Sequence, residues 1–193
     1  MVDRRTVLKL GATSAASVFI NVSATALGPN GPDSFRHPIA RAIFDGRSAE
    51  GLAFASEMRG SGVAVSEIET DLAQLWYGDL QVLLRKTPAP IAGLTDRTAL
   101  FCLEELARSV GMKVRYRVDH KLDRTGQLRH DAAGPASIVE AASRLHYRSG
   151  YGHTMAVLAR QFDPSESRGT DAQKRTGPSS RENTPVFVSW VIA

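Results

Sequence analysis

Two short segments of the chain combine residue types that could hold a small anion. Each follows an apolar run, and they read Asp45-Gly46-Arg47-Ser48 and Gly93-Leu94-Thr95-Asp96-Arg97-Thr98. A glycine lets the backbone approach a ligand, and an arginine can contact a carboxylate or phosphate through two N–H groups. The predicted ligand-binding residues are Arg47, Ser48, Thr95, Arg97 and Thr98. The alternative is that the hydroxyl and carboxyl residues only cap helices and that the arginines are solvated.

A second group of residues could carry acid–base chemistry. Histidine and aspartate occur together as Asp119-His120 and His130-Asp131, in a stretch that otherwise reads as a polar loop. The candidate catalytic residues are Asp45, Asp96, Asp119, His120 and His130. The spacing matches no HExxH or HxH motif and no cysteine pair, so we predict no metal site and interpret the loop first as simply polar.

The single cysteine limits the cofactors that the chain can hold. Cys102 has no partner for an intramolecular disulfide, and one thiolate cannot hold an iron–sulfur cluster. The CxxCH motif of c-type haem attachment is absent from the sequence. Cys102 lies on an apolar helix between Phe101 and Leu103, which favours a place in the core. No cofactor is therefore evident.

The elements that must position these residues alternate between strands and helices. Strands are predicted at 39–44, 63–68, 91–94 and 112–118. The helices between them are predicted to run from 48 to about 58, from 70 or 71 to about 86, and from 95 or 96 to about 110. This βαβαβαβ order predicts a small three-layer α/β/α domain with a mostly parallel sheet, whose fourth strand alternates in polarity as an edge strand does. A helix at 135–146, a helix or strand at 154–162 and a terminal strand at 185–192 follow. Residues 119–134 read as a polar loop and 163–184 as a disordered loop.

The N-terminal segment carries the three regions of an export signal. Arg4 and Arg5 precede Val7-Leu8-Lys9, a moderately apolar run covers 10–22, and Ala24 and Ala26 supply small residues before a cleavage point. Residues 1–26 resemble the twin-arginine (Tat) signal family, with Val7 where phenylalanine is commonest. The resemblance implies recognition by the Tat translocase, folding before export and a periplasmic or otherwise exported location. Cleavage after Ala26 would leave a flexible start at 27–37, a single domain at 38–193 and no stable membrane anchor; retention of the signal as an anchor is the alternative.

Composition and charge narrow the function classes. The chain has 193 residues and a formal net charge of +4, of which the signal contributes half. The remainder is too weakly basic for a nucleic-acid-binding protein. The leading interpretation is a periplasmic accessory or small-anion-binding protein, possibly a small subunit that partners an exported redox enzyme. The alternative is a small periplasmic hydrolase or isomerase that uses the aspartates and histidines around the 119–134 loop.

Overall fold

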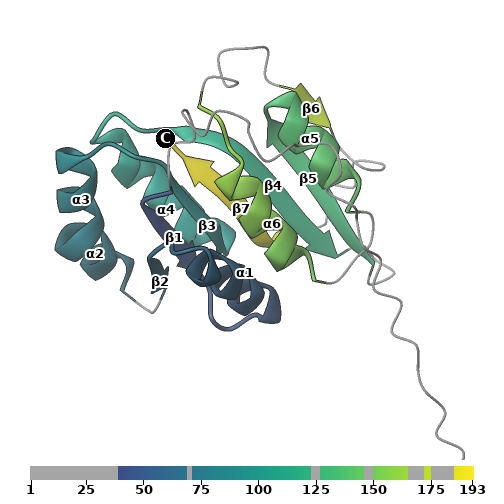
Figure 1. The fold of residues 1–193 in the computed structure, drawn as a ribbon, viewed down its shortest axis with the longest axis horizontal. Helices are drawn as coiled ribbons and strands as arrows, with labels where there is room; N and C mark the ends of the chain where they lie inside the picture. The colour runs from purple at the N-terminus through teal and green to yellow at the C-terminus, as the bar shows by residue number, and fades with distance from the viewer. Residues whose placement is uncertain (1–38, 69–70, 123–126, 146–149, 165–171, 175–184) are drawn as a thin grey trace, which may run out of the picture. The chain divides into compact units, whose positions relative to one another are not determined.

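Strands and helices alternate along most of the chain, as the apolar periodicity predicts. The computed structural model describes residues 39–68, 71–122, 127–145, 150–164, 172–174 and 185–193 (Figure 1). Its strands are β1 (Arg41–Phe44), β2 (Val65–Glu67), β3 (Ile91–Thr95), β4 (Val114–Leu122), β5 (Leu128–Gly134), β6 (Ala172–Lys174) and β7 (Pro185–Ile192). Its helices are α1 (Ala49–Gly60), α2 (Leu72–Leu75), the π-helical η1 (Trp76–Leu80), α3 (Gln81–Lys86), α4 (Arg97–Arg108), α5 (Ala136–Ser143) and α6 (Tyr151–Arg160).

The seven described strands form one mixed sheet in the order β2-β1-β3-β7-β4-β5-β6. Strand β1 pairs in parallel with β2 and β3, whereas the other four pairings are antiparallel. The prediction of a mostly parallel sheet is therefore wrong. The reason is the C-terminal strand: β7 does rejoin the sheet as predicted, but it inserts between β3 and β4 and runs antiparallel to both.

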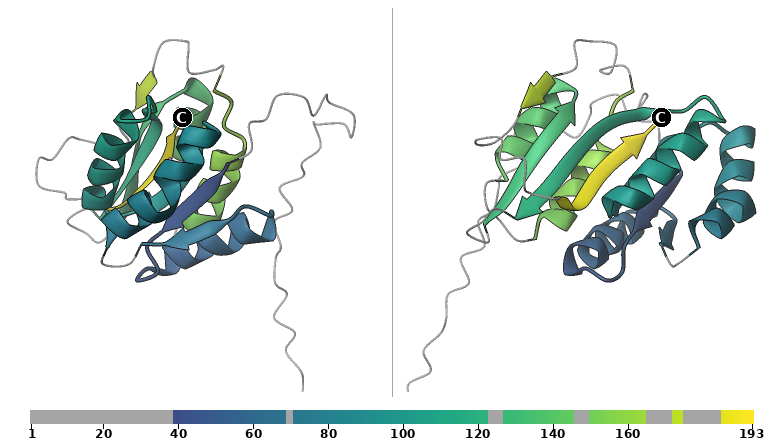
Figure 2. Two further views of the ribbon diagram at one scale, coloured as in Figure 1. Left: turned by 90° about the vertical axis from the view of Figure 1, so that its left-hand side faces the viewer. Right: turned by 180° about the vertical axis from the view of Figure 1, so that it is seen from behind.

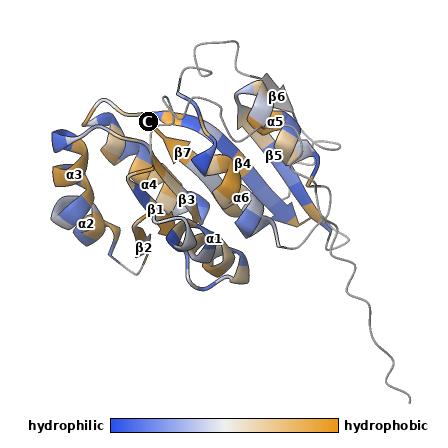
Figure 3. Cartoon of the chain, in the orientation of Figure 1, coloured by the Kyte–Doolittle hydropathy of each residue, from blue (hydrophilic) through white to orange (hydrophobic). Residues whose placement is uncertain are grey.

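Helices cover both faces of the sheet, which confirms the α/β class and the three layers (Figures 1 and 2). Apolar residues of α1, α5 and α6 pack on one face, including Phe54, Ile138 and Met155. Residues of η1, α3 and α4 pack on the other, including Trp76 and Leu103. Successive residues of a strand point to opposite faces, so each strand contributes to both cores. Figure 3 shows hydrophobic residues along β7 and more hydrophilic ones along β4 and β5.

The stretch predicted as a polar loop is mostly strand. β4 continues past Val118 to Leu122, and β5 pairs with it in antiparallel register, so that His120 lies opposite His130. β4 is also an interior strand between β7 and β5, which corrects its predicted edge position. The alternating charged residues, which suggested a loop and an edge strand, occupy the polar positions of two paired strands.

Three other predicted segments differ in detail. The helix expected at 70–86 is interrupted by the π turn η1, which buries Trp76 while Tyr77 stays exposed. The ambiguous segment at 154–162 is helix α6, which begins earlier, at Tyr151 after the left-handed Gly150. Part of the predicted disordered loop, 172–174, is the edge strand β6.

Several predictions concern residues outside the described ranges. These are the export signal at 1–26, the flexible start at 27–37, and the predicted loop at 165–171 and 175–184. Within the described ranges, the helices are too short or too polar to cross a lipid bilayer.

Candidate functional site

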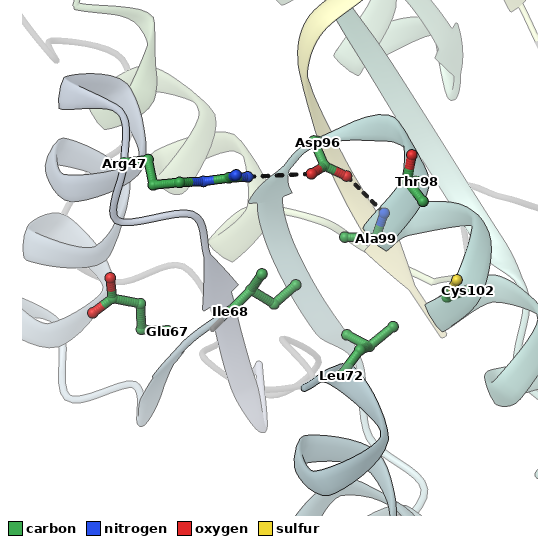
Figure 4. Close-up of a pocket in the computed structure, with 8 residues that line it drawn as sticks. All are labelled: Arg47, Glu67, Ile68, Leu72, Asp96, Thr98, Ala99 and Cys102. Atoms are coloured by element: carbon green, nitrogen blue, oxygen red, sulfur yellow. Dashed lines mark hydrogen bonds and ion pairs between the residues drawn. The ribbon is translucent and has the colours of Figure 1, made fainter. Parts of the chain in front are cut away.

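A pocket lies where β1, β2 and β3 end (Figure 4). Its volume is about 550 Å³, within the range of small-molecule sites. The carboxyl ends of these three parallel strands meet at one edge of the sheet, where the first turns of the following helices expose backbone N–H groups. The lining residues are Arg47, Glu67, Ile68, Leu72, Asp96, Thr98, Ala99 and Cys102.

The most prominent polar group of the pocket is the guanidinium of Arg47. Its side chain is 75% exposed and lies over the fully buried carboxylate of Asp45. Arg47 Nε donates to Asp45 Oδ1 at 2.9 Å, Nη2 donates to Oδ2, and the Arg47 backbone N–H donates to Oδ1 at 3.0 Å. The side-chain hydrogen bonds from Arg47 hold the pKa of Asp45 below its usual value, against the opposing effect of burial. Asp45 is thus an ionised anchor that fixes the orientation of Arg47.

Asp96 joins the pocket to helix α4. Its Oδ1 accepts the Ala99 N–H at 2.7 Å, which makes Asp96 the N-cap of α4, and its Oδ2 lies 3.3 Å from Arg47 Nη2. In Figure 4, Arg47 reaches toward Asp96 from the turn between β1 and α1, while Thr98 and Cys102 lie on the α4 side. The Asp96 carboxylate therefore serves both as a helix cap and as a wall of the pocket.

Only part of the predicted ligand-binding set reaches the pocket. Arg47 and Thr98 line it, but Ser48 caps α1 by accepting the Gly51 N–H at 2.9 Å. Thr95 is fully buried, where its hydroxyl accepts the Trp190 indole N–H at 3.0 Å and donates to the Asp96 carbonyl. Arg97 is exposed and is not among the lining residues. The helix-cap alternative is correct for Ser48 and Asp96.

Sequence reasoning missed several lining residues. Glu67 ends β2, and Ile68 and Leu72 follow it. The same rule that pointed to Arg47, a polar residue after a parallel strand, would have indicated Glu67. Cys102, predicted to be a core residue, is only partly buried and lines the pocket one helical turn after Thr98.

The two predicted histidines form a buried pair on the other face of the sheet. His120 Nδ1 and His130 Nδ1 are 2.6 Å apart, and His120 Nε2 lies 2.7 Å from the hydroxyl oxygen of Ser189. The ring of Tyr151 in α6 stacks on His120 with a centroid distance of 3.9 Å. Burial, reinforced by the charge of His130, lowers the pKa of His120 well below its usual value.

The side chains of Ser189, His120 and His130 contact one another in sequence, in the same order as the nucleophile, the base and the orienting group of a catalytic triad. However, Ser189 is 1% exposed and His120 is fully buried, so no substrate reaches the serine hydroxyl in this structure. The network instead ties β4, β5 and β7 to α6. Sequence inspection could not reveal Ser189 or Tyr151 as partners, because they are 69 and 31 residues from His120.

The remaining predicted catalytic residues do not join the histidines. Asp119 precedes His120 on β4, so its side chain points to the opposite face, where Arg117 Nη2 donates to it at 2.7 Å. Asp96 lines the pocket and Asp45 lies buried behind Arg47, while no histidine is among the described residues that line it. The structure thus separates the five candidates into three places.

The first turn of α6 is held by a carboxylate of α1. Glu50 accepts the backbone N–H groups of Gly150 and Gly152 at 2.6 and 2.7 Å. Burial and the charge of Glu50 raise the pKa of Tyr151, which stays a neutral phenol against His120. These contacts explain how α6 positions Tyr151 over the histidine pair.

No model of a protein family, no curated protein and no solved structure matches the chain. Among the described residues, no three or more histidine, cysteine, aspartate or glutamate side chains come together in a group that could hold a metal ion. Function must therefore be argued from the pocket itself.

Proposed function

We propose that the chain is an exported α/β binding protein that holds a small polar molecule in the pocket at the ends of β1, β2 and β3. The observation that carries this proposal is the oriented guanidinium of Arg47, fixed by Asp45 at a pocket of about 550 Å³. A side chain that is already ordered loses little conformational entropy when a ligand binds, so such a group favours affinity. Ile68 and Leu72 add apolar walls, as is usual in small-molecule sites.

The pocket supports binding better than it supports catalysis. Acid–base catalysis needs a proton donor or acceptor within hydrogen-bond reach of the substrate. His120 and His130 are buried under Tyr151 on the other face of the sheet and do not line the pocket. Asp45 is already paired with Arg47. The hydrolase or isomerase alternative therefore has less support than the binding protein.

Two arginines, Arg47 and Arg97, provide a matched test of the site. We expect a mixture of small carboxylates and amino acids to raise the melting temperature of the wild-type chain, because ligands that bind only the folded state stabilise it. Arg47→Ala should lose this ligand-dependent shift, whereas Arg97→Ala should keep it, since Arg97 does not line the pocket. Differential scanning fluorimetry measures both. Equal shifts in the two variants would refute the role of Arg47.

Export through the Tat translocase is the second part of the proposal, and it is supported by Arg4 and Arg5 with the small residues Ala24 and Ala26. We expect the double substitution Arg4→Lys and Arg5→Lys to leave the full-length chain in the cytoplasm, while the wild type reaches the periplasm without residues 1–26. Cell fractionation followed by intact mass measurement reads out both location and cleavage. Equal export of the two forms would count against the Tat route.

A protein partner is compatible with this route. Tat substrates fold before export, and we propose that this chain travels alone or as a small accessory subunit of an exported redox enzyme. Affinity capture of the mature chain from the periplasm distinguishes the two possibilities, because a subunit would bring down its enzyme in fixed stoichiometry.

A further inference from the structure

The buried histidine pair has room for only one proton between its two rings. His120 Nδ1 and His130 Nδ1 face each other at 2.6 Å, so one nitrogen carries the N–H and the other accepts it. Protons on both atoms would set two N–H groups against each other, and a charge on either ring would be held away from water. Acid therefore favours any state of the protein in which the pair is open to solvent.

The titratable groups that face His120 come from two other elements. They are His130 on β5 and Tyr151 on α6, and Tyr151 is in turn close to the carboxylate of Glu50 on α1. Further charged side chains of β4 and of the helices on this face pair elsewhere: Asp119 with Arg117, Lys121 with Asp131, Glu57 with His153 and Arg160, and Glu140 with Arg144. The histidine pair is thus the acid-sensitive part of the cluster around pH 6.

Tyr151 covers the pair from the first turn of α6. Its ring stacks on His120 with a centroid distance of 3.9 Å and meets His130 edge-on at 5.3 Å. The N-cap of α6 is Gly150, which has no side chain to cap the helix. Instead, Glu50 accepts the N–H groups of Gly150 and Gly152. A first turn whose N–H groups depend on another helix can open locally while the rest of the fold stays intact.

The same glutamate connects this turn to the pocket. Glu50 lies in the first turn of α1, beside α6 in Figure 1, and follows Arg47 by three residues. The two backbones are in close contact, since a Cβ built on Gly152 would lie 2.0 Å from the Glu50 carbonyl oxygen. One built on Gly51 would lie 2.1 Å from the Asp45 carbonyl oxygen. A displacement of the α6 turn is therefore passed directly to the residues that hold Arg47.

Resting on the proposed binding function, we propose that residues 150–152 form an acid-operated latch on the pocket. When the histidine pair takes up a proton, Tyr151 leaves the rings and Glu50 loses the N–H groups of this turn. The first turn of α1 then loses its support from α6, and Arg47 loses its fixed position. A ligand held by Arg47 is released in acid and retained near neutral pH, where the latch is closed with or without ligand.

Amide hydrogen exchange of the ligand-free, full-length chain, followed by NMR from pH 7.5 to pH 5, measures the latch. Protection of the Gly150 and Gly152 amides, corrected for the intrinsic exchange rate, should fall about tenfold per pH unit below pH 6.5, because the open state binds one more proton. The Gly51 amide, which donates to Ser48 Oγ at 2.9 Å, should lose protection in parallel. Exchange that low concentrations of urea do not accelerate is local and is thereby distinguished from global unfolding.

Two substitutions of histidine locate the sensor. His120→Gln should remove most of the acid response at Gly150 and Gly51, and His130→Gln, made separately, should do the same. His153→Gln is the control, because His153 is also on α6 but is 63% exposed and pairs with Glu57. It should keep the full response.

A second pair of variants tests the link to the pocket. Glu50→Gln has one acceptor oxygen in place of two, so it should keep the acid response at Gly150 and lose it at Gly51. Glu57→Gln is the matched control, since Glu57 also joins α1 to α6 but contacts His153 and Arg160 rather than the latch. This variant should respond as the wild type does.

The outcomes separate the latch from the function on which it rests. A parallel acid response of Gly150, Gly152 and Gly51 that is lost in His120→Gln supports the latch. An unchanged response in that variant overturns it, and a response confined to residues 150–152 overturns its link to the pocket. The mixture of small carboxylates and amino acids, added at pH 5, should restore the protection of Gly51 by binding the closed form. No restoration, with the acid response intact, overturns ligand release and the binding function, while proton-driven opening stands.

Discussion

Acidification from about pH 7.5 to about pH 5 is expected to lower the free energy of unfolding by about 2 kcal/mol through His120. The reason is that His120 is fully buried between His130, Ser189 and Tyr151, which lowers its pKa in the folded state far below the value of 6.5 for a free side chain. Below pH 6.5 the unfolded chain takes up a proton at this position and the folded chain does not. Stability is therefore flat above this pH and falls as the pH decreases through it.

Urea denaturation at several pH values measures this dependence. His120→Gln should be less stable at neutral pH, because it loses the stacking on Tyr151, and should show a shallower loss of stability in acid. His153→Gln is the matched control, since the side chain of His153 is 63% exposed. If His120→Gln kept the wild-type slope, the buried histidine could not be the source of the pH dependence.

Gly93→Ala is expected to destabilise the fold by about 2–3 kcal/mol through overpacking. Gly93 lies in the middle of the sheet, opposite Trp190 on β7. A Cβ at this position would lie 2.2 Å from Trp190 Cζ2 and 2.9 Å from the Ile43 carbonyl oxygen. Trp190 is fully buried, and its indole donates to Thr95, the residue before the α4 cap. Displacing the indole should therefore disturb the pocket wall as well as the core.

The control for Gly93 is Gly78 in η1, where an added Cβ would meet nothing within 4 Å. Gly78→Ala should leave stability unchanged or raise it by about 0.5 kcal/mol, because alanine restricts the unfolded chain. Thermal and urea denaturation compare the two variants with wild type. A Gly93→Ala variant as stable as Gly78→Ala would show that Trp190 does not need the space.

The parts of the fold that depend on short sequence patterns were predictable. The positions of β1, β3, α1 and α4 follow from apolar periodicity, and their caps, Ser48 and Asp96, from residue type. Sheet order was not predictable in the same way, because pairing of β7 with β3 and β4 depends on contacts between residues that are far apart in the sequence, from Lys121 with Pro185 to Ile91 with Ile192. The polar stretch from Asp119 was misread as a loop because its charged residues occupy alternate strand positions.

The sequence predicted where in the fold the candidate site would lie, but not which residues would line it. The rule that ligands bind beyond the carboxyl ends of parallel strands pointed to Arg47 and Thr98, and the structure places both among the residues that line the pocket. It could not show that Thr95 would be used by Trp190, or that Asp45 would neutralise Arg47, because both depend on how side chains meet in three dimensions. The same limit applies to His120, whose partner Ser189 comes from the last strand.

The central claim is that a small polar ligand binds at the ends of β1, β2 and β3. The most direct test is an NMR titration of the ¹⁵N-labelled mature chain with the small carboxylates and amino acids that raise its melting temperature. The account predicts shifts of the backbone amides of Arg47, Thr98, Ala99 and Cys102, with those of His120 and His130 unchanged. Shifts centred on His120, His130 and Tyr151, with the pocket amides unmoved, would contradict it.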